Sequence, residues 1–374
     1  MKDYLLGILN HQKSKIDRLY SNIPMHGRIT AALEIPARER LNSITKRIEF
    51  LKADIIKSPK IFPVFLRSYV LIKEEIDSIE AIQVTTLNRW NDIDRKVNIL
   101  VDKMTTEIAF PISPPVVSCS SQRYYYTRPD DYIIFIPLTE GNLLLHFPDL
   151  YHELGHSLLS FSGDTRLEPY HKCYLHCILK AKNYVTSEIQ IEERNRGPNS
   201  LKIYFSYWNE SWFRWMMELF CDLFSVAVIG PAFVWSHLHL CVSTGENPYH
   251  VPLFHETTHP PDATRMNVML KMLELLNFND DMTSIKEKWN EYLFLRNSNP
   301  SPEYQRCFPE PLLSEITVYS HEGAKKLNCN VAHPSMDGYY RNLLNKAWYK
   351  FWESPEGYAE WEKDTVDRLM AKTN

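Results

Sequence analysis

The chain has 374 residues, of which 44% are hydrophobic and 24% are charged, a composition typical of a folded protein with one large or two ordinary domains. The net charge of −4, without a glycine-rich phosphate loop or a basic cluster among aromatic residues, makes nucleic acid an unexpected partner. Seven cysteines, an odd number without the spacing of a small secreted domain, predict free thiols and a cytoplasmic location.

The amino-terminal region, residues 1–109, is predicted to be helical. Its first residues lack the basic start and long apolar stretch of a signal peptide. Apolar residues at intervals of three and four form two narrow seams, which indicate helices that pack on each other or on a partner. The seams consist of Leu41, Ile44, Ile48, Leu51 and Ile55, and of Trp90, Ile93, Val97, Leu100 and Met104. We expect a helical hairpin or bundle that covers the rest of the protein. An arm that docks a regulatory protein partner is the less favoured alternative.

A proline-rich stretch, residues 111–115, marks the predicted start of a second region at residue 110, because proline cannot continue a helix. After it, the aromatic tract of residues 123–128 and the apolar run of residues 132–137 predict two short strands. We expect the second run to pair with an extended substrate, since peptides often bind by adding a strand to a sheet.

The next predicted helix carries the pattern HELGH at residues 152–156, between Pro148, which suits a first helical turn, and Gly163, which suits a stop. His152 and His156 lie one turn apart on one face of a helix, so both rings can bind the same cation. Glu153 lies beside that face, where its carboxylate can take a proton from a water molecule activated at that cation. The pattern is HExxH, which is typical of the zinc peptidases called zincins.

A third metal ligand is expected from another element, because a catalytic zinc ion takes three protein ligands and keeps one position for water. Glu218 and Asp222 lie one turn apart in the most hydrophobic tract of the chain, where an unpaired ionised carboxylate is costly. We expect Glu218 to bind the metal and Asp222 to accept a hydrogen bond from the far nitrogen of His152 or His156. The adjoining apolar tract, residues 223–235, is too short for a membrane span of about 20 residues, so no membrane is expected.

Other residues of the kind that bind metals occur in the helix predicted for residues 170–196, where Cys173 and Cys177 share a face. Their spacing lacks the paired arrangement of a structural zinc site, so a second metal site there is the less favoured interpretation.

The loop after the helix predicted for residues 231–243 contains four side chains that can donate a hydrogen bond to an oxyanion. They are Tyr249, His250, His255 and His259. His259 is the favoured oxyanion donor, because two prolines would hold it rigidly at the start of the next helix. In that helix, Arg265 is predicted to form a structural salt bridge with a carboxylate of the site. The alternative is that Arg265 binds a substrate carbonyl.

Three motifs together resemble the gluzincin metallopeptidases, the group that includes thermolysin and the CAAX-prenyl endopeptidases. The motifs are HELGH at residues 152–156, ExxxD at residues 218–222 and HPPDATR at residues 259–265. The resemblance covers about residues 130–275 and implies a zinc peptidase with a zincin-like catalytic domain. The chain departs from the CAAX branch in a helix-like insert between the first two motifs and in lacking membrane spans, so the substrate class is not carried over.

The expected fold is mainly α: a zincin-like (gluzincin) core with a short β-sheet at residues 110–278, between an amino-terminal helical region, 1–109, and a carboxy-terminal one, 279–374, without recognisable chemistry. The expected activity is hydrolysis of protein or peptide substrates by a soluble zinc metalloendopeptidase, with Glu153 as general base, Zn²⁺ as cofactor and His259 at the oxyanion. Two alternatives stay open. One is a non-catalytic, zinc-stabilised interaction protein that acts through its amino-terminal helices. The other is an enzyme that its helical regions keep latent.

Overall fold

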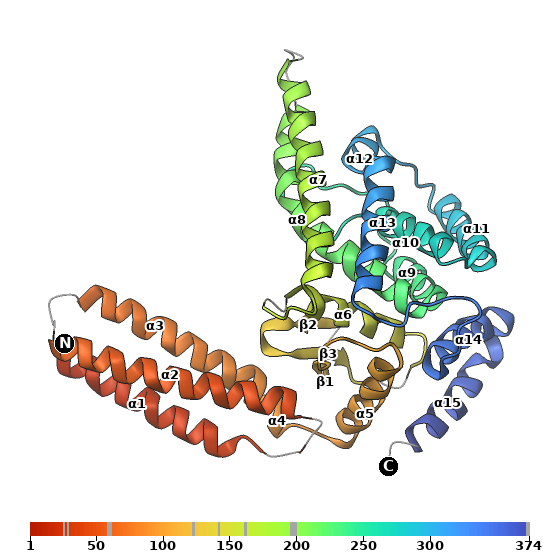
Figure 1. Cartoon of the computed structure of the whole chain (residues 1–374). Coiled ribbons are helices and arrows are strands. Elements are labelled where there is room, and N and C mark those ends of the chain that lie inside the picture. Colours follow the sequence, from red (N-terminus) through yellow and green to blue (C-terminus); the bar gives the residue numbers. More distant parts are fainter. Residues whose placement is uncertain are drawn as a thin grey trace. The chain divides into compact units, whose positions relative to one another are not determined.

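Helices form most of the part of the chain that the structure describes, and three short strands form one sheet there (Figure 1). The computed structural model describes residues 1–24, 27, 30–57, 62–121, 124–140, 143–160, 163–194 and 200–371. The prediction of a mainly helical protein with a short β-sheet is confirmed.

The chain divides into two compact units. The first contains residues 1–100 and 113–138, and the second contains residues 101–112 and 139–374. The regions predicted from the sequence, with boundaries near 110 and 278, do not coincide with these units. The difference has a physical reason: apolar side chains of the strands complete the core of the amino-terminal helices, and the helix of residues 339–353 packs on the helices of residues 200–229 and 231–244.

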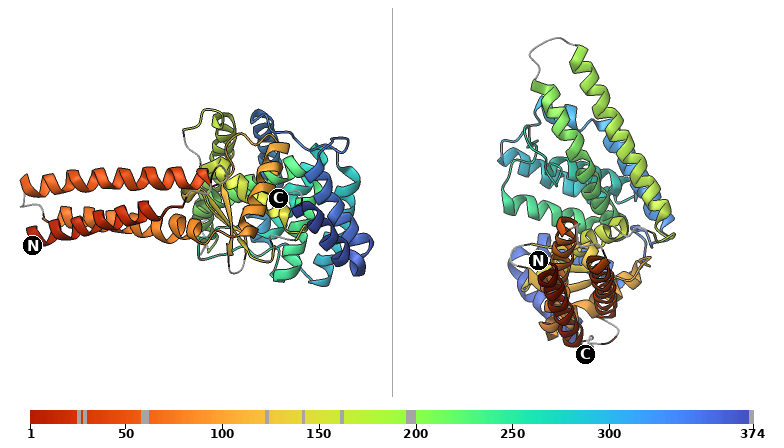
Figure 2. Two further views of the ribbon diagram at one scale, coloured as in Figure 1. Left: turned by 90° about the horizontal axis from the view of Figure 1, so that it is seen from below. Right: turned by 90° about the vertical axis from the view of Figure 1, so that its left-hand side faces the viewer.

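Three helices of the first unit lie side by side, α1 (Lys2–Asn22), α2 (Ala31–Lys57) and α3 (Phe62–Ile79) (Figures 1 and 2). The seam predicted in residues 41–55 is buried in the core that α2 forms with α1 and α3. These side chains therefore stabilise the bundle itself and are not free to dock a partner. A short π-helical turn, η2 (Glu80–Val84), and α4 (Thr85–Asn88) continue the chain from α3.

The sheet of the first unit follows α5 (Asp92–Glu107) and consists of β1 (Val116–Ser121), β2 (Tyr126–Arg128) and β3 (Ile133–Pro137), with a 3-10 turn, η3 (Pro129–Asp131), before β3. Residue 123 of the predicted aromatic tract lies outside the described residues. The strand order is β1-β3-β2, with β1 parallel and β2 antiparallel to β3. Arg40 Nη1 lies 2.8 Å from Asp131 Oδ1, so an ion pair joins α2 to the turn before β3.

The strand predicted to pair with a substrate is the central strand of the sheet, so that expectation is wrong. Ile133, Ile134 and Phe135 pair with β1 on one side and with β2 on the other. Side chains of α5 cover the outer edge of β1 as well. Asn98 Oδ1 accepts a hydrogen bond from the Val117 amide at 2.8 Å, and Asp94 Oδ1 accepts one from the Cys119 amide at 2.7 Å. The backbone of β3 is thereby satisfied inside the protein, which leaves no edge for an added strand.

A long helix, α8 (Ser200–Ile229), is the centre of the second unit, and α6, α7, α9, α10 and α13 pack against it. The bounds of the other helices are α6 (Phe147–Ser160), α7 (Glu168–Arg194), α9 (Pro231–Thr244), α10 (Asp262–Leu275), α11 (Asn279–Leu295), α12 (Pro302–Cys307), α13 (Glu310–Lys326), α14 (Tyr339–Glu353) and α15 (Pro355–Ala371). The predicted end of α7 at residue 196 lies outside the described residues. Gly230, with φ of 73°, and Pro231, in the first turn of α9, separate α8 from α9.

The last two helices are fixed to the rest of the second unit by the carboxylates of buried Glu362 and half-buried Glu107. Glu362 of α15 accepts a hydrogen bond from the Leu144 amide at 2.7 Å, just before α6. Glu107 accepts hydrogen bonds from the amides of Tyr340 and Arg341, each at 2.9 Å, at the start of α14. A carboxylate at this end of a helix satisfies free N–H groups and complements the helix dipole.

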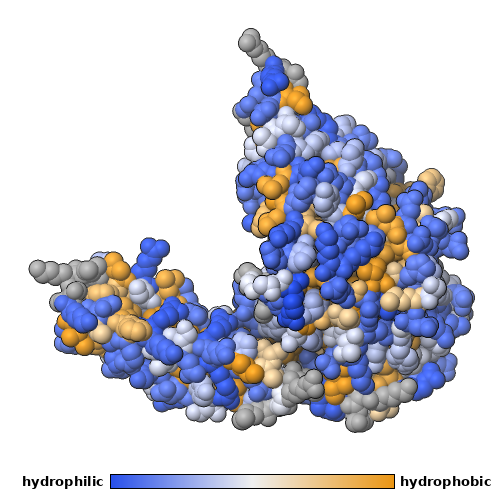
Figure 3. Space-filling view, viewed as in Figure 1, coloured by the Kyte–Doolittle hydropathy of each residue, from blue (hydrophilic) through white to orange (hydrophobic). Residues whose placement is uncertain are grey.

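The surface of the second unit mixes hydrophilic and hydrophobic residues (Figure 3). The helices α7 and α8 form a hairpin that extends beyond its neighbours (Figures 1 and 2), and exposed apolar side chains on α7 include Leu175, Leu179 and Ile191. In the part of the chain that the structure describes, no helix has both the length and the apolar content of a membrane span.

Candidate metal centre

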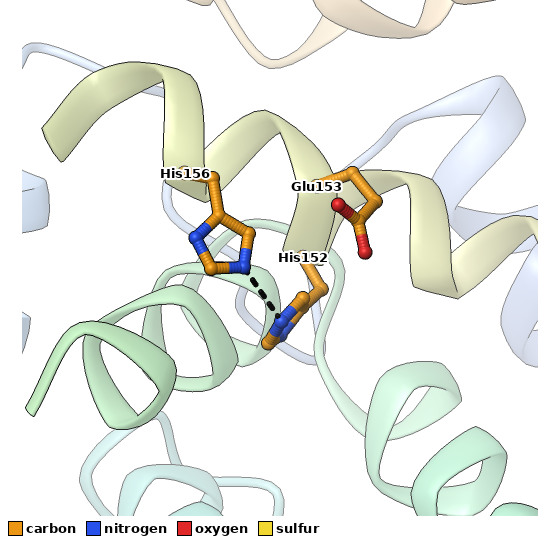
Figure 4. Close-up of side chains that lie close together, drawn as sticks. All are labelled: His152, Glu153 and His156. Atoms are coloured by element: carbon orange, nitrogen blue, oxygen red, sulfur yellow. Dashed lines mark hydrogen bonds between the residues drawn. The ribbon is translucent and has the colours of Figure 1, made fainter. Parts of the chain in front are cut away.

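The helix α6 presents His152 and His156 because its opposite side is held in the core. Leu150, Leu154 and Leu158, which recur one turn apart, are at most 1% exposed. Pro148 is the second residue of α6, and Gly163, with φ of 102°, follows its end. Figure 4 shows His152 and His156 one turn apart with their rings close together, and Glu153 beside them on the same helix.

A glycine allows α6 to approach α8 closely enough to bring the two motifs together. A Cβ atom at Gly155 would lie 2.9 Å from the Cα atom of Cys221, which precedes Asp222 on α8. Side-chain carbon atoms do not approach backbone atoms so closely without displacing them. Gly155 is therefore required by the contact between the helices and not by its backbone conformation.

Replacing Gly155 with alanine is expected to destabilise the second unit by about 1–3 kcal/mol, because the added methyl group must push α6 away from α8. The measurement is the free energy of unfolding in urea. Gly357→Ala is the matched control, since its Cβ would meet only the hydroxyl of Ser354, at 3.0 Å, which can rotate away. Equal stability of Gly155→Ala and Gly357→Ala would show that the two helices are not in such close contact.

Three potential ligand atoms converge between α6 and α8. His152 Nε2 lies 3.2 Å from His156 Nε2 and 3.2 Å from Glu218 Oε2, and His156 Nε2 lies 3.6 Å from Glu218 Oε1. A tetrahedral zinc ion bound at about 2.0–2.1 Å holds its ligand atoms roughly 3.4 Å apart. The structure therefore brings the three predicted ligands to the spacing that a zinc ion requires.

A buried oxygen at the point of convergence lacks a hydrogen-bond donor. Glu218 Oε2 lies near His152 Nε2, but the geometry is not that of a hydrogen bond, and no other donor reaches this oxygen among the described residues. Such a carboxylate oxygen is costly to bury unless a cation or donor satisfies it. The donor set of two imidazoles and one carboxylate suits Zn²⁺ and leaves a coordination position open.

Asp222 and Arg265 orient one of the two imidazoles from behind. Asp222 Oδ1 accepts a hydrogen bond from His152 Nδ1 at 2.8 Å, and Arg265 donates to both carboxylate oxygens, each at 2.7 Å. Asp222 is 0% exposed, so this is a buried bidentate ion pair. Because the proton of His152 is held on Nδ1, its Nε2 atom is unprotonated, and the lone pair of Nε2 faces His156 and Glu218. Of the two histidines that the sequence left open as the partner of Asp222, the structure selects His152.

The carboxylates of the centre differ in their affinity for protons. Burial raises the pKa of Glu153 to about 7, and its Oε2 atom has no hydrogen-bond partner among the described residues. Burial also acts to raise the pKa of Glu218, but the nearby His152 outweighs this effect and lowers the pKa to about 2. Glu218 is therefore ionised at neutral pH, whereas Glu153 has the proton affinity of a group that can both accept and release a proton there.

The loop before α10 places only one of its four candidate donors at the centre. His259 Nε2 lies 3.5 Å from Glu218 Oε2, and its Nδ1 atom is 2.9 Å from the Thr258 hydroxyl. The ring of Tyr249 packs instead against Tyr304, with centroids 4.9 Å apart. His250 and His255 are exposed, and among the described residues no hydrogen bond or ion pair joins them to the centre.

The three potential ligands are mostly buried, whereas His259 beside them is exposed. The side chains of His152 and Glu218 are 10% exposed and that of His156 is 12% exposed, whereas that of His259 is 63% exposed. The imidazoles are therefore neither sealed in the core nor fully open at the surface.

Asp149 is a residue of this neighbourhood that the sequence reasoning missed. It lies one turn before Glu153 on α6, and its Oδ1 atom accepts a hydrogen bond from Ser236 of α9 at 2.7 Å. Burial raises the pKa of Asp149 to about 6. The interval of four residues between two acidic side chains was the available signal, because it places them on one helix face.

The less favoured site at Cys173 and Cys177 is not a metal cluster in the described residues. Both cysteines are buried, and the histidines of the same helix have other partners. His171 Nε2 lies 2.6 Å from the Leu158 carbonyl, and His176 stacks on Tyr319.

No family model, curated protein or solved structure matches this chain.

Proposed function

We propose that this chain is a zinc-dependent endopeptidase of the gluzincin type, whose catalytic domain is zincin-like and includes α6, α8 and α10. The observation that carries the proposal is the convergence of His152, His156 and Glu218 at ligand spacing, with Glu153 beside them. Protein or peptide chains are the proposed substrates. The seven cysteines are all buried and free, which supports a reducing compartment such as the cytoplasm.

His152, His156 and Glu218 would hold the zinc ion, and Asp222 and Arg265 would keep His152 in the required tautomer. When bound, zinc supplies a Lewis acid that lowers the pKa of water toward about 7 and polarises a carbonyl group. The three ligands and the two orienting residues belong to three helices that pack together, so the centre is rigid before substrate binds.

Glu153 is the residue proposed to move the proton. Its carboxylate takes a proton from the attacking water and gives it to the amine that leaves the cleaved peptide bond. His259 is proposed to donate a hydrogen bond to the oxygen of the peptide carbonyl as negative charge develops on it. The distance of 3.5 Å between His259 Nε2 and Glu218 Oε2 and the exposure of the His259 side chain support this role, because they place a hydrogen-bond donor near the ligands that is not enclosed by the core.

The experiment that tests the function is a comparison of protein amino termini in cells that express the wild-type chain or Glu153→Gln. New amino termini that appear only with the wild type would identify an endopeptidase and its targets together. Identical sets of termini, with zinc bound to the wild-type protein, would contradict the proposal.

Glu218→Gln and Asp222→Asn are expected to weaken zinc binding to different degrees. Asp222→Asn removes a charge behind a ligand, a change that typically costs about 10–100-fold in metal affinity. Glu218→Gln removes a ligand and should cost more. Competition with a chromophoric chelator measures both affinities. An unchanged affinity in Glu218→Gln would place the third ligand elsewhere.

His259→Ala is expected to lower kcat by about 10²–10³-fold, the usual effect of losing an oxyanion donor, with zinc affinity unchanged. Peptide cleavage and zinc competition are measured on the same preparation. His250→Ala is the matched control, because this exposed histidine lies on the same loop away from the centre.

The position of His259 also supports a second candidate, a non-catalytic protein in which zinc holds the fold. Its Nε2 atom, 3.5 Å from Glu218 Oε2, is near enough to become a fourth ligand after a small movement. A fourth ligand would close the position that a substrate needs. If the protein is non-catalytic in this way, His259→Ala would weaken zinc binding without producing cleavage. If His259 instead keeps an enzyme latent, His259→Ala would create or increase cleavage.

A further inference from the structure

A second group of metal-binding side chains lies in the same unit, between the end of α9 and the start of α10. His237 and Cys241 are one turn apart on α9, and Asp262 is the first residue of α10. One ligand atom from each lies within 4.8 Å of the others. His237 and Cys241 are 2% and 1% exposed, and Asp262 is half-buried.

The separation between the sulfur of Cys241 and the nitrogen of His237 fits a tetrahedral zinc ion. Cys241 Sγ lies 3.5 Å from His237 Nε2. Zinc binds sulfur at about 2.3 Å and nitrogen at about 2.0–2.1 Å, so its tetrahedral sulfur and nitrogen ligands are separated by roughly 3.6 Å. A thiolate and an imidazole also favour zinc over magnesium or calcium, which prefer oxygen ligands.

The charges of the group are balanced by a divalent cation. A thiolate at Cys241 and the carboxylate of Asp262 supply two negative charges, and a neutral His237 supplies none. Cys241 lies in the last turn of α9, where the helix dipole favours a cation and opposes an isolated anion. Asp262 lies in the first turn of α10, where the dipole favours its negative charge.

The backbone around the three residues is fixed before any ion binds. The Cys241 carbonyl accepts hydrogen bonds from the Tyr292 hydroxyl at 2.9 Å and from the Gly245 amide at 3.0 Å. The amide of Ala263, next to Asp262, donates to the Pro248 carbonyl at 3.0 Å. Ligands held in this way lose little conformational freedom when they bind a metal.

The alternative interpretation is a core cluster that needs no ion. His237 Nε2 lies 3.3 Å from the Asp262 carbonyl, to which it can donate a long hydrogen bond. Its other nitrogen, Nδ1, is buried without a hydrogen-bond partner in the described residues. A zinc ion at Nε2 would require the imidazole proton on Nδ1, where His237, in contrast to His152, has no acceptor among the described residues.

We propose that His237, Cys241 and Asp262 form a second zinc site, which ties the end of α9 to the start of α10. Binding would replace the thiol proton of Cys241, which is released to solvent, while the imidazole proton of His237 resides on Nδ1. The half-buried Asp262 gives the ion its route of entry. The site supports the first centre, because Arg265, on the same turn of α10 as Asp262, holds Asp222. The proposal does not depend on the peptidase activity.

The test uses the full chain, stripped with a chelator and reloaded with Zn²⁺ or Co²⁺. The wild type should bind two equivalents of zinc, and Cys241→Ser and His156→Ala should each bind one. Cobalt should give the near-ultraviolet charge-transfer absorption of a thiolate ligand in the wild type and in His156→Ala, and it should be lost in Cys241→Ser. Cys307→Ser, a substitution of another fully buried cysteine, is the matched control and should retain the absorption.

Asp262→Asn tests the site in a variant that is expected to fold, because this half-buried side chain is replaced by one of equal size. This variant should also lose the second equivalent of zinc. The proposal is overturned if the thiolate absorption is absent from the wild type, if it survives Cys241→Ser, or if Cys221→Ser removes it instead. The wild type could also bind only one equivalent of zinc and show a cobalt thiolate absorption that Cys241→Ser removes. That result would support this site and exclude zinc binding at the first centre, so the two proposals can fail separately.

Discussion

Glu153→Gln is expected to lower kcat for peptide cleavage by about 10²–10⁴-fold, the usual contribution of a positioned general base. Glutamine keeps the size of the side chain but cannot accept a proton at neutral pH. The carboxylate it replaces is 6% exposed, and burial raises its pKa to about 7. The substitution also exchanges a buried carboxylate without a hydrogen bond at Oε2 for a neutral amide, so it should not destabilise α6.

The zinc content of Glu153→Gln should match that of the wild type, because the three ligands are unchanged. Glu168→Gln is the matched control, since this exposed glutamate at the start of α7 is paired only with Lys172. The rate of peptide cleavage and the zinc content, determined by mass spectrometry, are measured on the same preparation. Cleavage at the wild-type rate by a fully zinc-loaded Glu153→Gln would remove the general-base assignment.

Local periodicity predicted much of this fold. The seam at residues 41–55 is buried in a helical bundle, and the run at residues 132–137 contains a strand. The leucines of α6 are buried on the side of the helix opposite His152 and His156. Each of these features depends on neighbours within a few turns, which the interval between apolar residues records.

The features that the sequence did not predict depend on contacts between distant segments. The central place of β3 follows from pairing with β1 and β2, and an apolar pattern does not record strand order. The assignment of strands and carboxy-terminal helices to the two units likewise depends on long-range packing. The course of one loop places His259 near Glu218 and packs Tyr249 against Tyr304.

The candidate centre was predictable where two residues share one helix and uncertain where two helices meet. The interval of four residues in HELGH and ExxxD placed each pair on one face, but only the packing of α6 on α8 brings Glu218 to both imidazoles. His237 and Cys241 have the same interval. The interval alone does not single them out, because Asp262, the third member of their group, comes from another helix.

Arg265→Met is expected to destabilise the metal-free protein by about 3–5 kcal/mol, because it leaves the carboxylate of Asp222 buried without its cation. Asp222 is 0% exposed and accepts two hydrogen bonds from Arg265, each at 2.7 Å. Arg265 is itself 7% exposed, so solvent cannot replace the lost partner without rearrangement. Unfolding in urea, followed by tryptophan fluorescence, measures the effect, since all tryptophans except Trp90 lie in the second unit.

The double substitution Asp222→Leu with Arg265→Met separates stability from function. Removing both charges together avoids the uncompensated buried ion, so the free energy of unfolding should return close to the wild-type value or exceed it. Zinc affinity should nevertheless stay about 10–100-fold below that of the wild type, because nothing then holds the proton of His152 on Nδ1. If the double variant instead binds zinc as tightly as the wild type, the ion pair serves only to stabilise the fold, and the orientation of His152 must come from the packing of α6 alone.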